Sequence, residues 1–298
     1  MNHSKGFSLV ELAVAFTIIV LLLAGAMIPL STQMDLRAIA DTQRSMESIR
    51  EAIVGFAQAN GRLPCPAAGN STAGTELVTA GSCNNNFGVV PWATLGVAET
   101  DFWGRRITYG VAPAFADAAA FTTWNTRLNA YTPPAGNLPQ VVSSPNSLAN
   151  QTPACDLAIA PTASSFALCT LGDIAVFTRG DATTTAATSG GALAAVIISH
   201  GKNGFGGWQT NGTQRQPIPP AGTDENANAF GTMQATPTGG YLNRAFWSRT
   251  PTRPTAGCAD PIPGAPLNTA PACEFDDIAV TISSNALITR MVAAGRLP

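Results

Sequence analysis

Side chains that could carry out acid–base or nucleophilic chemistry are scarce in this sequence. The chain has 298 residues and two histidines, His3 at its start and His200. A Ser–His–Asp site would have to use His200, and the sequence has no G-x-S-x-G turn to present the serine. His200 lies in a Gly- and Asn-rich segment, where a histidine bonded to water or within a turn is commoner than a catalytic base. We therefore expect no catalytic residues and no enzyme activity.

Three arginines, Arg244, Arg249 and Arg253, flank the aromatic pair Phe246 and Trp247. Basic and aromatic side chains together can bind single-stranded nucleic acid. The formal net charge of −2, with only 11% Asp, Glu, Lys and Arg, argues against a basic chain. Three arginines in a Pro-rich segment are more simply explained as solvated, so we expect no nucleic-acid partner.

The elements that would position such side chains are short strands and two helices. Short runs rich in β-branched residues, bounded by Gly, Asp or Ser, are typical of strands. Four segments fit this pattern: Ile107–Val111, Asp173–Thr178, Leu193–Ser199 and Asp277–Ser283. A last helix is expected over about residues 285–294, between Ser283 or Ser284 as its N-cap and Gly295 as its end. The Pro- and Thr-rich segments Pro113–Thr170 and Thr210–Pro271 are expected to form long loops.

The other helix begins with an apolar run from Phe7 to Leu30, in which Glu11 is the single charge. Its 24 residues exceed the roughly 20 that a helix needs to cross about 30 Å of hydrocarbon. Lys5 and the amino terminus are positive, which favours an N-terminus in the cytoplasm and the rest of the chain outside. The sequence therefore predicts a single transmembrane helix over residues 7–30.

The helical pattern continues from Ser31 to Asn60. Apolar residues recur there at spacings of three, four and seven, at Leu36, Ile39, Met46, Ile49, Ile53 and Phe56. This spacing lays an apolar stripe along one face, and charged residues fill the other faces. Asn60–Gly61 is a typical helix end. We expect one helix of about 80 Å, with a second half that packs on an antiparallel sheet in an α+β fold.

A carboxylate inside an apolar helix is costly, so Glu11 is a candidate functional residue. The segment G-F-S-L-V-E-L, Gly6–Leu12, resembles the prepilin cleavage motif of type IV pilins and type II secretion pseudopilins. The resemblance implies that a prepilin peptidase cuts after Gly6 and that the new terminal amine of Phe7 is methylated. It also implies that Glu11 pairs with a terminal amine during filament assembly, since a buried carboxylate and cation offset each other's desolvation only when close.

The resemblance divides the chain into four parts: a leader at 1–6, a transmembrane and filament-core helix at 7–30, an amphipathic helix at 31–60 and a periplasmic globular domain at 61–298. It implies a minor pilin or pseudopilin, a structural subunit of a type IV pilus or a type II secretion pseudopilus. Its partners would be prepilin peptidase and other pilins, in the inner membrane and, after assembly, on a pilus or the cell surface. The Trp103–Gly104 turn and the glycine-rich loop at 201–207 follow the order of the major pseudopilin, although this chain is much longer.

The same resemblance suggests a calcium site. The major pseudopilin holds calcium between its glycine-rich loop and a following acidic segment, and the matching residues here are Asp224, Glu225 and Asn228. Carbonyls of Ser199–Gly204 would add ligands, and Asp276 and Asp277 could also contribute. Clustered carboxylate, amide and carbonyl oxygens are what Ca²⁺ takes as ligands. A polar loop tip without metal would explain the same residues.

The six cysteines all follow the apolar run, which places them in the oxidising periplasm if the topology is correct. Zinc is disfavoured because there is no CxxC and there are only two histidines. Six cysteines allow 15 pairings, and sequence alone does not choose among them. The simplest hypothesis pairs neighbours around each loop-rich segment: Cys65–Cys83, Cys155–Cys169 and Cys258–Cys273.

Other interpretations of the chain stay open at this stage. A Sec signal peptide cleaved at Ala24–Ala26, or an unprocessed signal anchor, would account for export but not for Glu11 or the amphipathic continuation. A pilus-tip adhesin would use the polar insertion at Pro113–Thr170 to bind a ligand. A membrane-anchored exported hydrolase would have to rely on His200.

Overall fold

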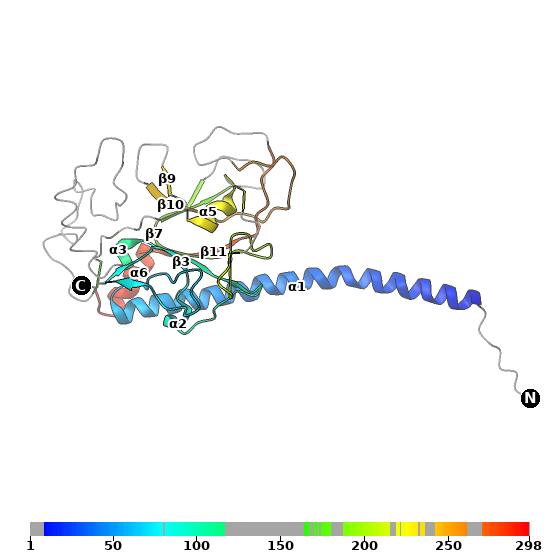
Figure 1. Ribbon diagram of the computed structural model, residues 1–298, viewed down its shortest axis with the longest axis horizontal. Coiled ribbons are helices and arrows are strands. Elements are labelled where there is room, and N and C mark those ends of the chain that lie inside the picture. Colours follow the sequence, from blue (N-terminus) through cyan, green and yellow to red (C-terminus); the bar gives the residue numbers. More distant parts are fainter. Residues whose placement is uncertain are drawn as a thin grey trace, which may run out of the picture.

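The computed structural model describes residues 9–79, 81–116, 164–166, 168, 170, 172, 174–179, 187–214, 219–220, 222–231, 233–235, 242–260 and 270–297. Its first element is the helix α1, Leu9–Asn60, which rises over about 80 Å. The first half of α1 extends away from the rest of the molecule, and the second half lies along the domain (Figure 1). The prediction of one continuous helix that ends at Asn60 is confirmed.

The two halves of α1 differ in what their side chains contact. Apolar side chains of the first half are exposed, from Leu9 at 85% to Leu21 at 73%. In the second half, Met46, Ile49 and Ile53 are buried as the stripe predicts. The prediction that Leu36 belongs to the buried stripe is wrong, since this side chain is 62% exposed. The buried face of the helix continues instead through smaller side chains such as Thr42. Within the part of the chain that the structure describes, no helix is both long and apolar enough to cross a membrane.

The main sheet is built around the long strand β7, Ala187–Ser199. The strand order is β3-β5-β7-β6-β10-β9, and β11 also pairs with β7. The other strands of this sheet are β3 (Phe87–Val89), β5 (Thr108–Val111), β6 (Ile174–Thr178), β9 (Met233–Ala235), β10 (Leu242–Trp247) and β11 (Ile278–Ser283). The four predicted strands correspond to β5, β6, β7 and β11. The expected antiparallel sheet is mixed instead, because β10 runs parallel to β6.

Two small ribbons and four short helices complete the described chain. The ribbons pair β1 (Val78–Thr79) with β2 (Ser82–Cys83) and β4 (Arg105–Arg106) with β8 (Trp208–Gln209). The helices are α2 (Trp92–Leu95), α3 (Pro113–Ala116), α5 (Asp224–Phe230) and α6 (Ser284–Ala293). The expectation of an unbroken loop over Thr210–Pro271 is therefore wrong, since α5, β9 and β10 lie within it.

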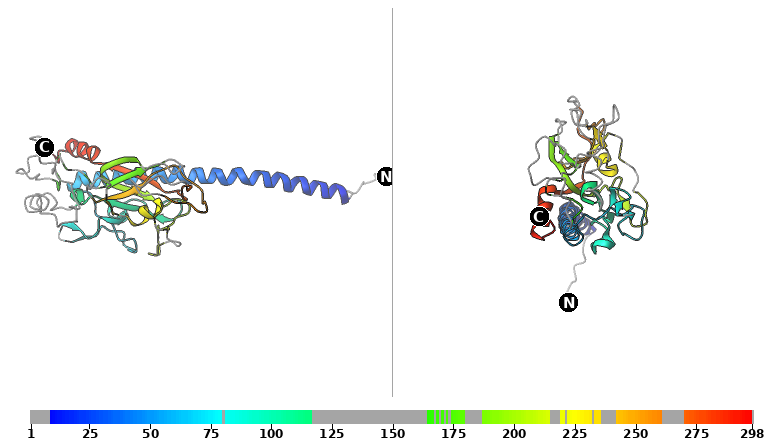
Figure 2. Two further views of the ribbon diagram at one scale, coloured as in Figure 1. Left: turned by 90° about the horizontal axis from the view of Figure 1, so that it is seen from above. Right: turned by 90° about the vertical axis from the view of Figure 1, so that its left-hand side faces the viewer.

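The core lies between the sheet and the helices α1 and α6. Met46 and Ile53 of α1 and Leu287 of α6 pack in one cluster with Tyr109 of β5 and Ile197 of β7. Figure 2 shows α6 beside α1 when the molecule is seen from the end of the domain. The Ser283 side chain accepts a hydrogen bond from the Ala286 amide, so the predicted N-cap of α6 is confirmed.

Two of the three predicted disulfides are present. Cys65 bonds to Cys83 and Cys258 to Cys273, each between neighbours in the sequence. Cys155 and Cys169 lie outside the described residues. The first bridge ties the segment after α1 to β2, and the second closes a loop just before β11.

Candidate functional site

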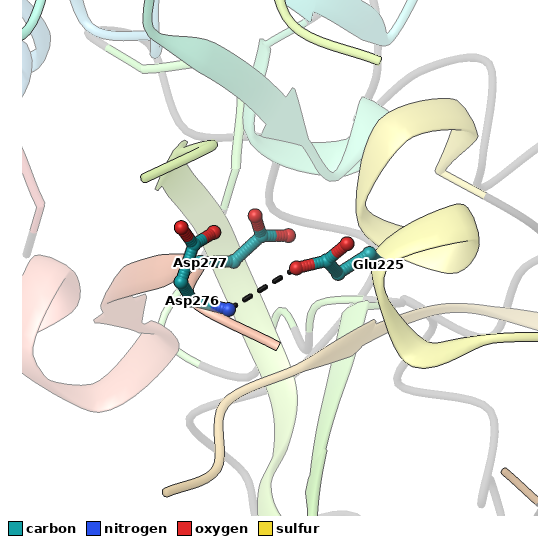
Figure 3. A group of neighbouring side chains, drawn as sticks. All are labelled: Glu225, Asp276 and Asp277. Atoms are coloured by element: carbon teal, nitrogen blue, oxygen red, sulfur yellow. Dashed lines mark hydrogen bonds between the residues drawn. The ribbon is translucent and has the colours of Figure 1, made fainter. Parts of the chain in front are cut away.

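Three carboxylates from two distant segments meet at one point. Glu225 comes from the first turn of α5, and Asp276 and Asp277 directly precede β11. One oxygen of each lies within 4.8 Å of the others, a spacing that suits ligands of a single cation. Figure 3 shows Glu225 directed from its helix towards the two aspartates. This acidic cluster is the candidate site.

Helix α5 presents Glu225 because both ends of the helix and one of its faces are fixed. Thr223 caps the N-terminus and accepts from the Asn226 amide at 3.2 Å. Asn228 is buried against β10, where its Oδ1 accepts from the Trp247 amide at 2.7 Å. Its Nδ2 donates to Asp277 Oδ2 at 2.8 Å, which ties the helix to the acidic cluster. Asn228 thus orients Asp277 through a hydrogen bond.

The glycine-rich loop after β7 contacts the same cluster. Asn203 Nδ2 donates to Glu225 Oε1 at 2.9 Å, and the Asn203 amide donates to Asp276 Oδ2 at 2.8 Å. Gly201 has φ of 55°, and a Cβ there would lie 2.4 Å from the Asp276 carbonyl oxygen. The loop therefore needs glycine to approach this closely. The structure brings the glycine-rich loop and Glu225 together, as the sequence suggested.

The electrostatics of the cluster disfavour negative charge on its carboxyl groups when no cation is bound. Burial, followed by the charge of Asp277, raises the pKa of Glu225 to about 9. Burial also raises the pKa of Asp276 to about 7, although the Asn203 amide lowers it. Among the described residues, the buried Oδ1 atoms of Asp276 and Asp277 accept no hydrogen bond. A buried carboxylate oxygen without a donor is costly, so the cluster has the chemistry of a cation site.

His200 lies at the back of this cluster and is fully buried. Its Nδ1 is 3.6 Å from Asp277 Oδ1, and its Nε2 is 2.8 Å from Thr108 Oγ1. Both neighbours are themselves almost completely buried. The three side chains have the types of a nucleophile, base and acid, and all three are buried.

Asp224 belongs to a different group of charges. Its Oδ1 accepts from Arg179 at 2.9 Å, and its Oδ2 lies 2.7 Å from Arg249 Nε. Arg249 also contacts Asp260, at 3.5 Å, so two arginines and two aspartates form one buried network. Burial and the charge of Asp260 raise the pKa of Asp224 to about 7 against the opposing effect of both arginines. The candidate ligand set therefore changes from Asp224, Glu225 and Asn228 to Glu225, Asp276 and Asp277.

The three arginines do not form a common surface. Arg249 is buried in the network just described. Arg244 donates to the Gly231 carbonyl and lies over the Phe87 ring, and Arg253 is exposed. The sequence offered no signal for the network, because Arg179, Asp224, Arg249 and Asp260 are spread over three segments.

The predicted assembly residue Glu11 lies far from the acidic cluster, on the half of α1 that projects from the domain (Figure 1). Glu11 is in the first turn of α1, among the exposed apolar side chains of that half-helix. Gly6 and Phe7 lie outside the described residues. The acidic cluster and Glu11 are thus two separate candidate sites: the first is formed by α5 and the start of β11, and the second lies on α1, and Figure 1 labels these elements.

Comparison with known proteins identifies only the beginning of the chain. No curated protein and no solved structure matches this chain. One family model matches, the prokaryotic N-terminal methylation motif, over residues 1–27. The matched residues include Gly6, Phe7 and Glu11, the residues that the resemblance singled out. The chain therefore carries, at its N-terminus, the methylation motif that is the prepilin signal of type IV pilins and pseudopilins.

Proposed function

We propose that this protein is a minor pilin or pseudopilin, a structural subunit that assembles through α1 into a pilus or a secretion pseudopilus. Prepilin peptidase would cut after Gly6, and residues 7–30 would hold the subunit in the inner membrane before assembly. The periplasmic domain would then stand on the outside of the filament. The observation that carries the proposal is the projecting half of α1 (Figure 1), whose large apolar side chains between Leu9 and Leu21 are exposed.

The exposure of these side chains supports an apolar environment around them. Burial of a Val, Leu, Ile or Phe side chain is worth roughly 1.5–3 kcal/mol. Nine large apolar residues between Leu9 and Leu21 are about half exposed or more. Lipid could cover them before assembly and the helices of neighbouring subunits afterwards. In such a setting Glu11 would be stable only beside a cation, and the methylated amine of Phe7 on a neighbour would supply one.

Two measurements test this proposal. Mass spectrometry of the mature N-terminus should find a chain that begins with N-methylated Phe7, whereas a start at Met27 would favour a Sec signal peptide. The Glu11→Ala variant should be processed normally but be lost from purified filaments. Glu47→Ala on the exposed face of the same helix is the matched control and should be incorporated like the unchanged protein. Equal incorporation of both variants would refute the pairing role of Glu11.

We infer no catalysis by this protein. The complete burial of His200, the one histidine that follows the motif, supports this. A His200→Ala variant should therefore change stability and no activity, and a hydrolytic activity lost in that variant would contradict the inference.

A specific observation favours a second role for the domain, the binding of calcium by Glu225, Asp276 and Asp277. The buried Oδ1 atoms of the two aspartates, which accept no hydrogen bond among the described residues, fit a hard cation with oxygen ligands. Titration with Tb³⁺ should give sensitised luminescence that Ca²⁺ displaces. Asp277→Asn should weaken this binding by tenfold or more, and Glu99→Gln, on a carboxylate outside the cluster, should leave it unchanged. Equal Tb³⁺ binding by both variants would refute the proposed calcium site.

A further inference from the structure

A small pocket opens beside the acidic cluster and shares Glu225 with it. Its volume is about 170 Å³, comparable to one long side chain. Its walls are mostly apolar, from Phe205, Pro220, Pro254 and the Cys258–Cys273 disulfide. Four separate segments thus converge around one opening, and the disulfide holds two of them together.

Two carboxylates line this apolar pocket. Glu225 is buried, with Oε1 already bonded to Asn203 and to the Asp276 amide. Glu274 is half-buried, and among the described residues its carboxylate makes no hydrogen bond and no ion pair. The lining includes no Lys, Arg or His. The pocket therefore combines an apolar wall with the carboxylate of Glu274, which no cationic side chain of the described chain neutralises, and with the buried carboxyl group of Glu225.

We propose that this pocket receives a lysine side chain of a partner protein. The apolar walls would bury the tetramethylene stem, and the ammonium group would lie between Glu274 and the second oxygen of Glu225. The Phe205 ring adds an aromatic surface that attracts a cation. The proposal goes beyond the assembly role of α1. Because Glu225 belongs to both sites, a metal ion at the cluster would compete with the ammonium group for this residue.

The arrangement of acceptors favours lysine over arginine. A guanidinium binds best to two coplanar oxygens of one carboxylate. Here Glu225 has one oxygen engaged and Glu274 comes from a different segment, so a group that contacts both residues meets acceptors on two separate carboxyl groups. A compact ammonium with three donors satisfies such acceptors better than a planar fork.

The partner is a different protein rather than a second copy of this chain. The sequence contains two lysines, and Lys5 precedes the cleavage site of the prepilin motif. The other, Lys202, is already paired with Asp35 of α1 at 2.7 Å. A second copy would have to break that ion pair to supply its lysine.

Ligand-observed saturation-transfer NMR on the full-length chain in detergent, with EDTA to remove metal, tests the proposal. The probes are Nα-acetyl-lysinamide, its Nε-acetylated form and Nα-acetyl-argininamide. We expect saturable binding of the lysine probe, at least tenfold weaker binding of the uncharged probe, and weaker binding of the arginine probe. Glu274→Gln should weaken the lysine probe by about fivefold, and Glu47→Gln on α1 should not.

Equal binding of the charged and uncharged probes, stronger binding of the arginine probe, or an unchanged affinity in Glu274→Gln would each overturn the proposal. Thermal unfolding checks that each variant is folded. Phe205→Leu keeps an apolar wall but removes the aromatic ring, so its binding of the lysine probe is a second test of the pocket. If the protein binds Tb³⁺ but not the lysine probe, the lysine pocket is refuted and the proposed calcium site is unaffected. Normal lysine binding in a variant that cannot enter filaments would separate it from the assembly role.

Discussion

Replacement of Arg249 by Met is the sharpest test of the buried charge network beneath α5. The substitution keeps an apolar stem of similar length but removes the guanidinium, which contacts Asp224, Asp260, Thr252 and the Cys273 carbonyl. Both aspartates are buried, and only Arg179 would remain to offset the charge of Asp224. Removal of one partner of a buried ion pair costs about 3–5 kcal/mol, because the other charge is left uncompensated. We expect a loss of that size in the free energy of unfolding at pH 8.

The loss should depend on pH in a defined direction. The pKa of Asp224 is already raised to about 7, and removal of Arg249 raises it further. Stability linked to such a raised pKa is present at low pH and is lost as pH rises through the folded-state value. The deficit of Arg249→Met should therefore be smaller at pH 5 than at pH 8. The double variant Arg249→Met/Asp224→Asn should recover part of it at pH 8.

Urea unfolding of the full-length chain in mild detergent measures these differences, with Trp247 fluorescence as a local probe. Trp247 reports on the network because the guanidinium of Arg179 lies 4.0 Å from its ring centroid. Arg44→Met is the matched control, since Arg44 is exposed and pairs only with Asp41 along the same helix face. That change should stay within about 0.5 kcal/mol. A loss below about 1 kcal/mol in Arg249→Met, or a loss independent of pH, would refute the reasoning.

Three further predictions concern the acidic cluster and its supports. Without metal, thermal unfolding should show a more stable protein at pH 5 than at pH 8, because the pKa values of Glu225 and Asp276 are raised to about 9 and about 7 from 4.5 and 3.8. Ca²⁺ should reduce this difference in stability. A protein that is more stable at pH 8 without metal would contradict the prediction. Gly201→Ala should destabilise the protein by about 1–3 kcal/mol, because the backbone there has a positive φ and the new Cβ would collide with Asp276. The control Gly55→Ala in α1 has open space around the new Cβ and should stabilise the protein slightly. The double change Cys258→Ser/Cys273→Ser should lower the free energy of unfolding by about 3 kcal/mol, as expected for a closed loop of this length, and should weaken binding of the lysine probe. The control Cys65→Ser/Cys83→Ser should lower stability and leave binding of the probe unchanged.

The sequence by itself determined the features that depend on neighbours along the chain. The motif at Gly6–Glu11, the single helix to Asn60, four strands and the Ser283 cap all follow from local patterns, and two of the disulfides join neighbouring cysteines. Each can be predicted because its cause lies within a few residues, in helical period, strand composition, capping or loop closure.

Only the tertiary structure decided which acidic residues act together. Asp224 and Glu225 are adjacent, yet one faces the arginines and the other faces Asp276 and Asp277. Successive residues of a helix point about 100° apart, so the packing of α5 against β10, and not the sequence spacing, assigns each carboxylate to its site. The parallel pairing of β10 with β6 is equally non-local, because it joins segments about 70 residues apart whose composition gives no register.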